Sequence, residues 1–357
     1  MTGNIGEWSE LYTLFKLLAD GRLYAADANT DKIPNIYYDI IKVIRAQSTG
    51  TFEYLRSSQV KVICAETGDE ICSIPIQSFI EQTDKLLMGI KGNKGGKGSF
   101  ELAEVWQFAE SIKCNSLKAK STDKSDIHLM VHDIMSGRDD IFGFSIKSQL
   151  GSPSTLFNAS GATNFIYKIT GKSLTCDEIN TFNSFKKFKE KFDYLNSVGA
   201  DVIFSKIEND TLNFNLKMVT SEMPEILAEM IKLYYHGRAN SIPELTDIVS
   251  NSGITTTINN KIYCSHNVKE MLTNIALGMV PNTLWTGDYE ATGGFIIVKE
   301  DGDVVCYHIY NRNSFKNYIF AATRFDTPSQ SKHGFGKIFE KDGEQWLKLN
   351  IQIRFIK

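Results

Sequence analysis

Two alternating stretches joined by a short polar turn constrain this chain most. Residues 126–133 and 142–149 each alternate apolar and polar side chains, and Ser136–Asp140 between them is typical of a turn. Alternation with a period of two predicts strands that bury one face, and a turn between two such strands predicts an antiparallel hairpin. The hairpin would carry Asp126 on one strand and Lys147 on the next, facing each other.

A carboxylate and a lysine on neighbouring strands suit metal-dependent cleavage of a phosphodiester. Asp126 can bind a hard divalent cation through oxygen, and the cation stabilises phosphate charge and lowers the pKa of a bound water. Lys147 can then orient or deprotonate that water. The alternative is an ordinary hairpin in which Asp126 and Lys147 are solvated surface residues.

The hairpin resembles the PD-(D/E)xK nuclease motif, with two departures. Ser125 stands in the position of the motif's proline, and Ser145 stands in the position of its second acid. The resemblance implies Asp126 as a metal ligand and Lys147 as the catalytic lysine. It also implies that a second carboxylate comes from elsewhere in the chain.

Glu10 is the candidate for this second acid and metal ligand. It lies in a helix predicted over residues 4–20, whose apolar residues cover more than one stripe. A carboxylate in such surroundings needs a cation or a metal, because burying it alone is costly. A solvated surface glutamate is the alternative, and the neighbouring Glu7 fits that description better.

Other candidates for the catalytic site remain open. Gln149, two residues beyond Lys147, is a further catalytic candidate, and three other acids could replace the missing carboxylate: Asp133, Asp139 and Asp140.

Composition limits the class of protein. The chain has 357 residues, of which 42% are hydrophobic and 23% charged, as in soluble globular proteins. A net charge of −3 argues against indiscriminate binding of polyanions but allows a local basic cleft. Six scattered cysteines without a CxxC pair indicate neither a zinc ribbon nor a disulfide framework. With no signal peptide and no membrane-length apolar run, we expect a cytoplasmic protein without membrane contact.

Periodicity predicts a mixed α/β (α+β) protein. Helices are expected over residues 4–20, 34–45, 75–90, 100–112, 177–197, 222–236, 242–251 and 267–279. Strands are expected in the central hairpin and over residues 23–27, 60–66, 70–74, 210–219, 294–299, 304–310 and 346–355. We expect a nuclease core with a mixed central sheet flanked by helices over 1–170, a mainly helical region over 171–285 and a β-rich segment over 286–357, the three forming separate domains or one continuous domain.

Several polar segments have the chemistry of DNA contacts. Arginine forks suit guanine edges, glutamine suits adenine, and small hydroxyl and amide side chains suit phosphate and sugar. The glycine-rich stretch 91–99 is not a Walker A motif, but its lysines could touch a DNA backbone. Ordinary surface loops are the alternative for all of these segments. The DNA-binding candidates are Lys94, Lys97, Thr155, Asn158, Arg312, Arg324, Ser329, Gln330, Ser331 and Lys332.

Short blocks along the whole chain resemble the HpaII-type restriction endonucleases. They are residues 6–12, 124–127, 144–148, 155–160, 163–165, 310–312, 326–329 and 348–355, and they occur in this order. The resemblance implies a restriction-endonuclease-like core and a type II deoxyribonuclease that uses Mg2+ to cut both strands of double-stranded DNA at a short palindrome, CCGG in the namesake. It also implies a cognate DNA methyltransferase. A homodimer would match the two-fold symmetry of the site, and a monomer that cuts the two strands in sequence is the alternative.

The start of the chain carries a second resemblance. Gly3, Gly6 and Glu10 have the spacing of the first helix of the MutH-like nucleases, in which the glutamate joins the active site, and this favours Glu10 over Glu7. Two alternative functions are a repair or nicking nuclease of the same superfamily and a catalytically inactive DNA-binding protein. Metal-dependent cutting into fixed fragments would separate a restriction enzyme from both.

Overall fold

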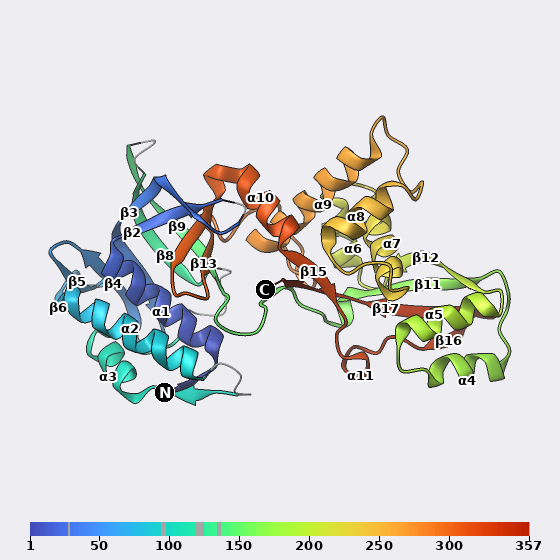
Figure 1. Ribbon diagram of the computed structural model, residues 1–357, viewed down its shortest axis with the longest axis horizontal. Coiled ribbons are helices and arrows are strands. Elements are labelled where there is room, and N and C mark those ends of the chain that lie inside the picture. The colour runs from blue at the N-terminus through green and yellow to red at the C-terminus, as the bar shows by residue number, and fades with distance from the viewer. Residues whose placement is uncertain (28, 94–97, 119–124, 134–136, 357) are drawn as a thin grey trace. The chain divides into compact units, whose positions relative to one another are not determined.

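The computed structural model describes residues 1–27, 29–93, 98–118, 125–133 and 137–356. The chain forms two compact units (Figure 1). Unit 1 combines residues 1–154 with 289–318, and unit 2 combines residues 155–288 with 319–356. Each unit therefore contains segments from distant parts of the sequence, whereas the expected division had three contiguous segments.

Unit 1 is built on one nine-stranded sheet. Its strand order is β2-β14-β13-β9-β8-β3-β4-β5-β6, and β2 also pairs with β3, so that six of the strands close into a ring. The β13–β9 and β14–β2 pairs are parallel and the other pairs are antiparallel, which confirms a mixed sheet. The strands are β2 (Arg22–Ala26), β3 (Lys32–Gln47), β4 (Gly50–Arg56), β5 (Gln59–Cys64), β6 (Glu70–Pro75), β8 (Ile127–Asp133), β9 (Arg138–Ser148), β13 (Gly294–Val298) and β14 (Val304–His308).

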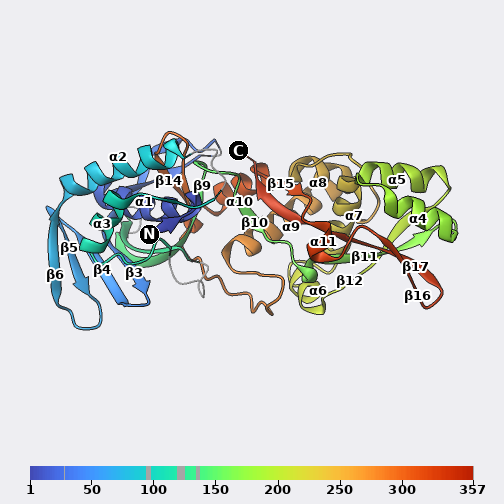
Figure 2. The same cartoon turned by 90° about the horizontal axis from the view of Figure 1, so that it is seen from below.

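The remaining elements of unit 1 are helices and one short strand pair. They are β1 (Thr2–Gly3) with β7 (Phe100–Glu101), α1 (Ile5–Asp20), α2 (Ile76–Gly92), α3 (Ala103–Ser111), a 3-10 turn (Ile309–Asn311) and the start of α10 (Arg312–Ala321). Helices α1 and α2 lie side by side against the sheet (Figure 2). The predicted helices at 4–20, 75–90 and 100–112 and the hairpins at 60–74 and 294–310 are confirmed, except that Phe100–Glu101 forms β7 and the second hairpin ends at His308.

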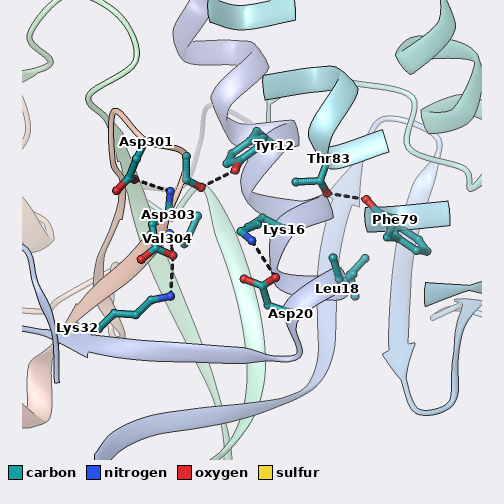
Figure 3. Close-up of polar contacts among 12 residues, drawn as sticks. Tyr12, Lys16, Leu18, Asp20, Lys32, Phe79, Thr83, Asp301, Asp303 and Val304 are labelled. Carbon is teal, nitrogen blue, oxygen red and sulfur yellow. Dashed lines mark hydrogen bonds and ion pairs between the residues drawn. The ribbon is translucent and has the colours of Figure 1, made fainter. Parts of the chain in front are cut away.

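Helix α1 forms the centre of the hydrophobic core of unit 1. A capping box starts it, in which Asn4 and Glu7 bond each other's backbone N–H, and Gly21 ends it with a left-handed φ of 72°. Ten of its residues are buried, so the helix packs on more than one side. Tyr12 donates a hydrogen bond to the carbonyl of Gly302, which ties α1 to the turn between β13 and β14 (Figure 3).

The expectation of a helix over 34–45 is wrong, because this segment lies inside the long strand β3. The strand has a β-bulge between Ile40 and Lys42. Tyr38 and Ile40 are buried before the bulge and Val43 after it, so the bulge turns an alternating pattern into a spacing that imitates a helix. The segment is rich in β-branched and aromatic residues, which fit a pleated sheet.

Unit 2 packs helices against two smaller sheets. One sheet has the order β12-β11-β17-β16 and the other has the order β10-β18-β15. The strands are β10 (Thr155–Phe157), β11 (Asn164–Thr170), β12 (Asp201–Ile207), β15 (Thr323–Asp326), β16 (Ile338–Lys341), β17 (Glu344–Asn350) and β18 (Gln352–Phe355). The helices are α4 (Cys176–Ser184), α5 (Phe188–Ser197), α6 (Asp210–Lys217), α7 (Met223–Tyr235), α8 (Ile242–Ser250), α9 (Asn260–Leu277) and α11 (Gln330–His333), with a 3-10 turn at Gly161–Thr163.

The expectation of a strand over 210–219 is also wrong, because Asp210–Lys217 forms α6. Asn209 caps the helix through its side chain, and the buried residues Leu212, Asn215 and Leu216 have helical spacing. Phe214, which completed the apparent alternation with its leucine neighbours, is 47% exposed.

Two other predicted elements are divided. The helix expected over 177–197 is interrupted between α4 and α5, and the strand expected over 346–355 is split at Ile351 into β17 and β18. The split at Ile351 moves the chain from the first sheet to the second. The mixed α/β class and the mainly helical middle of the chain are confirmed. No helix in the described ranges is long and apolar enough to cross a membrane.

Candidate active site and DNA-reading face

The central hairpin forms as predicted and brings Asp126 beside Ser145. Ile127 pairs with Phe144, and the backbone N–H of Asp126 donates to the Phe144 carbonyl at 2.8 Å. Oδ2 of Asp126 accepts from the Ser145 hydroxyl at 3.1 Å and from the Ile146 N–H at 2.6 Å. The serine in place of the second acid therefore orients the carboxylate of Asp126.

Lys147 lies two residues further along β9 and is half-buried. Its Nζ is 5.3 Å from the centre of the Phe295 ring on the neighbouring strand β13. Loss of hydration lowers the pKa of Lys147, and the negative charges of Asp126 and Glu10 oppose this shift. Both carboxylates are thus close enough to act on the lysine, so the structure brings these three predicted residues together.

Glu10 reaches this place because α1 packs on β9. The hydroxyl of Ser9, the residue before Glu10, donates to the hydroxyl of Ser148 at 2.8 Å, one residue after Lys147. Glu7, one turn earlier, has a different role. Its Oε2 accepts from the Asn4 N–H at 2.9 Å, and its Oε1 lies 3.1 Å from Nζ of Lys118.

Ser125 occupies a confined place next to Asp126. It is 1% exposed, and its hydroxyl donates to the Glu290 carbonyl at 3.0 Å. A Cβ on Gly143 would lie only 2.2 Å from Ser125 Oγ, so the facing strand needs a glycine at this point. The serine in the motif's proline position thus fixes the approach of the chain to Asp126.

The three alternative acids lie away from Asp126. Asp133 ends β8, seven residues from Asp126, a separation of about 23 Å along a strand. Asp139 forms a 2.7 Å ion pair with His132 at that same far end of the hairpin. Asp140 is five residues from Ser145, about 17 Å along β9. The hairpin therefore does not bring these acids to the site.

Gln149 follows the end of β9. Its backbone N–H donates to the carbonyl of Val298 on β13 at 2.8 Å, and the residue is half-buried. The position is next to Ser148 and two residues beyond Lys147, at the end of the hairpin that carries Asp126.

The donor set fits a hard divalent cation. Asp126 and Glu10 could supply two carboxylate oxygens. Within the described ranges no larger group, of three or more His, Cys, Asp or Glu side chains, is arranged to hold a metal. Mg2+ is usually held by one or two carboxylates together with waters and substrate phosphates. A pair of acids beside a lysine therefore suits this kind of ion.

Two predicted DNA-binding residues meet on the three-stranded sheet of unit 2. Arg354 of β18 pairs with Thr155 of β10 on one side and with Arg324 of β15 on the other. These three residues thus form one row across the sheet. Gln352 and Asp326 pair with each other two residues along the same two strands. Gln352, Asp326 and Arg354 were not among the DNA-binding residues predicted from the sequence. Polar residues at every second position of residues 352–355 were the available signal.

The other DNA-binding candidates are scattered. Ser329 caps the short helix α11, which contains Gln330, Ser331 and Lys332 directly after β15, and Ser329, Ser331 and Lys332 are exposed. The exposed Asn158 follows β10. Arg312 starts α10 and belongs to unit 1, whereas the other described candidates belong to unit 2. Lys94 and Lys97 lie outside the described residues.

Comparison with known proteins defines the class. The chain is 42% identical over 360 aligned residues to the type II restriction enzyme HpaII of Haemophilus parainfluenzae, and the alignment covers 99% of each chain. No solved structure matches the chain significantly. A hairpin that presents an acid and a lysine, together with this relative, identifies a type II restriction endonuclease, which cleaves DNA at specific sites.

The family follows from the second comparison. The sequence pattern of the HpaII restriction endonuclease family matches residues 4–355. The chain belongs to this family, as its short blocks indicated.

Proposed function

We propose that this enzyme hydrolyses both strands of double-stranded DNA at CCGG, with Mg2+ as its cofactor and a restriction-endonuclease-like core in unit 1. The observation that carries the proposal is the hairpin that holds Asp126 beside Ser145, two residues before Lys147, with the α1 residue next to Glu10 bonded to Ser148 on the same strand. The family resemblance supports CCGG, and the pair of oxygen-donor side chains supports Mg2+.

The acids and the lysine would have distinct roles. Asp126 and Glu10 would hold the ion, and Ser145 and the Ile146 N–H would keep the Asp126 carboxylate in place. When bound, the ion stabilises charge on the scissile phosphate and lowers the pKa of a bound water. Lys147 would orient that water or accept its proton at Nζ, which its lowered pKa favours. Gln149 would supply a further polar contact.

The two units would divide the work. Unit 1 would cleave, and unit 2 would recognise DNA through Thr155, Arg324 and the exposed residues of the 329–332 segment. Asn158, Arg312, Lys94 and Lys97 would contact the DNA backbone.

The cellular setting follows from the same activity. An enzyme that cuts a short palindrome endangers the DNA of its own cell, so a cognate methyltransferase would protect those sites. A symmetric homodimer would match a two-fold palindrome. The six cysteines are free thiols, which suits the cytoplasm.

A digest of unmethylated phage DNA tests the proposal. The purified protein would be incubated with Mg2+ or with EDTA, and the fragment ends would be sequenced. Discrete fragments that form only with Mg2+ and end within CCGG are expected. Fragments sharing another palindrome would refute CCGG, single-strand nicks would indicate a nicking enzyme, and specific binding without cleavage would indicate an inactive binder.

A further inference from the structure

One face of the sheet β10-β18-β15 carries a row of polar side chains. Arg354 and Arg324 lie directly opposite each other on β18 and β15, with Thr155 on the other side of Arg354. The residues next to these arginines along their strands point to the other face and are buried. Phe325, after Arg324, is 1% exposed, and Ile353, before Arg354, is 0% exposed. The polar face is the less buried one, and 33% of the Arg354 side chain is exposed.

Two arginines facing each other across a strand pair do not stabilise a sheet. Like charges directly opposite each other repel, with Cβ atoms about 5 Å apart. Asp326 balances one of the two charges, since its Oδ2 accepts from Arg354 Nη1 at 3.2 Å and from Gln352 Nε2 at 3.0 Å. The buried Nε of Arg354 has no hydrogen-bond partner within the described part of the chain. These costs point to a purpose other than stability.

We propose that Arg354 and Arg324 read adjacent guanines in the major groove, and that Asp326 positions Arg354 for this contact. This inference rests on the proposed function, because it needs a DNA site that contains guanine. Arg354 would use the exposed end of its guanidinium, since one donor on Nη1 is held by Asp326. A guanidinium fork matches the O6 and N7 acceptors of guanine.

The dimensions of the sheet suit this contact. The major groove admits a two-stranded β-ribbon, and β15 and β18 form an antiparallel pair that carries both arginines on one face. Neighbouring arginines about 5 Å apart at Cβ can converge on bases that are stacked about 3.4 Å apart along one strand. The 329–332 segment follows β15 by only two residues, so its polar side chains continue from the same edge.

Atom-specific DNA substitution tests the proposal. Each guanine of the cleaved sequence would be replaced in turn by 7-deazaguanine, which lacks only the N7 acceptor, and binding of the wild-type enzyme would be measured. We expect affinity to fall about 10- to 100-fold at a guanine read by an arginine fork. Arg354→Met, which keeps an unbranched stem but has no donor, should lose a similar factor on the natural site and become insensitive to 7-deazaguanine at one guanine only. Arg324→Met should become insensitive at the neighbouring guanine.

A matched control and a second variant complete the experiment. Lys172→Met removes an exposed cation of unit 2 that pairs with Glu178 and follows β11 of the other sheet, and it should keep wild-type affinity and sensitivity. Asp326→Asn should weaken the 7-deazaguanine effect at the Arg354 guanine and leave the effect at its neighbour.

Several outcomes would overturn the proposal while DNA cleavage stands. They are a cleaved site without guanine, a wild-type enzyme insensitive to 7-deazaguanine at every position, and a folded Arg354→Met enzyme that keeps full sensitivity. If Arg354→Met weakened binding equally on every DNA sequence, Arg354 would contact phosphate instead of a base. Failure of the wild-type enzyme to cut any DNA would remove the proposed function itself.

Discussion

Replacing Lys147 by methionine should separate catalysis from stability. Methionine keeps a long unbranched stem over the Phe295 ring and removes the charge that lies near Asp126 and Glu10. A positioned general base contributes about 10²- to 10⁴-fold to a rate, which corresponds to about 2.7–5.4 kcal/mol. We therefore expect cleavage to fall by that factor, with little change in DNA affinity.

The same substitution should not destabilise the protein at neutral pH. Burial lowers the pKa of Lys147 below its ordinary value of 10.5, so the unfolded chain binds this proton more tightly than the folded one. Between the two pKa values the unfolded state carries more protons, and stability rises with pH across that window. Below the window the charged lysine opposes folding. Lys147→Met removes this penalty together with the pH dependence that it causes.

Single-turnover cleavage, DNA-binding anisotropy and urea unfolding would measure these effects. Lys16→Met is the matched control, because Lys16 forms a 2.9 Å ion pair with Asp20 at the end of α1 (Figure 3). It should cost at most about 1 kcal/mol and leave cleavage unchanged. A folded Lys147→Met enzyme that still cleaves at more than a tenth of the wild-type rate, or that no longer binds DNA, would refute the role of Lys147.

Three further predictions concern the same unit. Gly143→Ala would place a Cβ 2.2 Å from Ser125 Oγ, so we expect a loss of about 1–3 kcal/mol in urea unfolding; an unchanged midpoint would contradict this packing. Burial lowers the pKa of His308 from 6.5 to about 4, so the unfolded state binds more protons in that range and stability should fall by about 3 kcal/mol as the pH drops through it. His308→Phe should remove this acid loss of stability, and a variant whose stability has the same pH dependence as that of wild type would contradict the role of His308. Glu10→Gln should slow Mg2+-dependent cleavage at least tenfold, whereas Glu7→Gln should cost about 1 kcal/mol through its cap and leave the rate unchanged; equal rates for both would refute the assignment.

The sequence predicted the hairpin because local alternation and turn residues define its register. Once Ile127 pairs with Phe144, Asp126 must lie beside Ser145. The position of Glu10 near Lys147 could only be inferred from its apolar surroundings and from the family resemblance. It depends on the packing of α1 against β9, which local sequence patterns do not show.

The failures have equally local causes. In β3 a single bulge after Ile40 changed the phase of an alternating strand, and single-sequence periodicity cannot detect such a bulge. In α6 the leucines fitted a strand pattern, and the contacts of Asn215 with the carbonyls of Val280 and Thr283 that hold the helix involve residues far along the chain.

The polar face of the β10-β18-β15 sheet could not be predicted for a related reason. Its central row joins Thr155 with Arg324 and Arg354, which are more than 160 residues away from it in sequence. Only the pairing of β10, β18 and β15 brings them together. The sequence supplied the residue types and the sheet supplied their arrangement.

The central claim is that the carboxylate of Asp126 holds the catalytic metal ion of a site-specific nuclease. The most direct measurement compares wild type and Asp126→Asn on one radiolabelled duplex containing the cleaved palindrome, with and without Mg2+, in parallel cleavage and binding assays. The wild-type enzyme should cut both strands only with Mg2+, and Asp126→Asn should bind the duplex with similar affinity and leave it intact. Cleavage by Asp126→Asn at the wild-type rate, or wild-type cleavage in EDTA, would contradict the account.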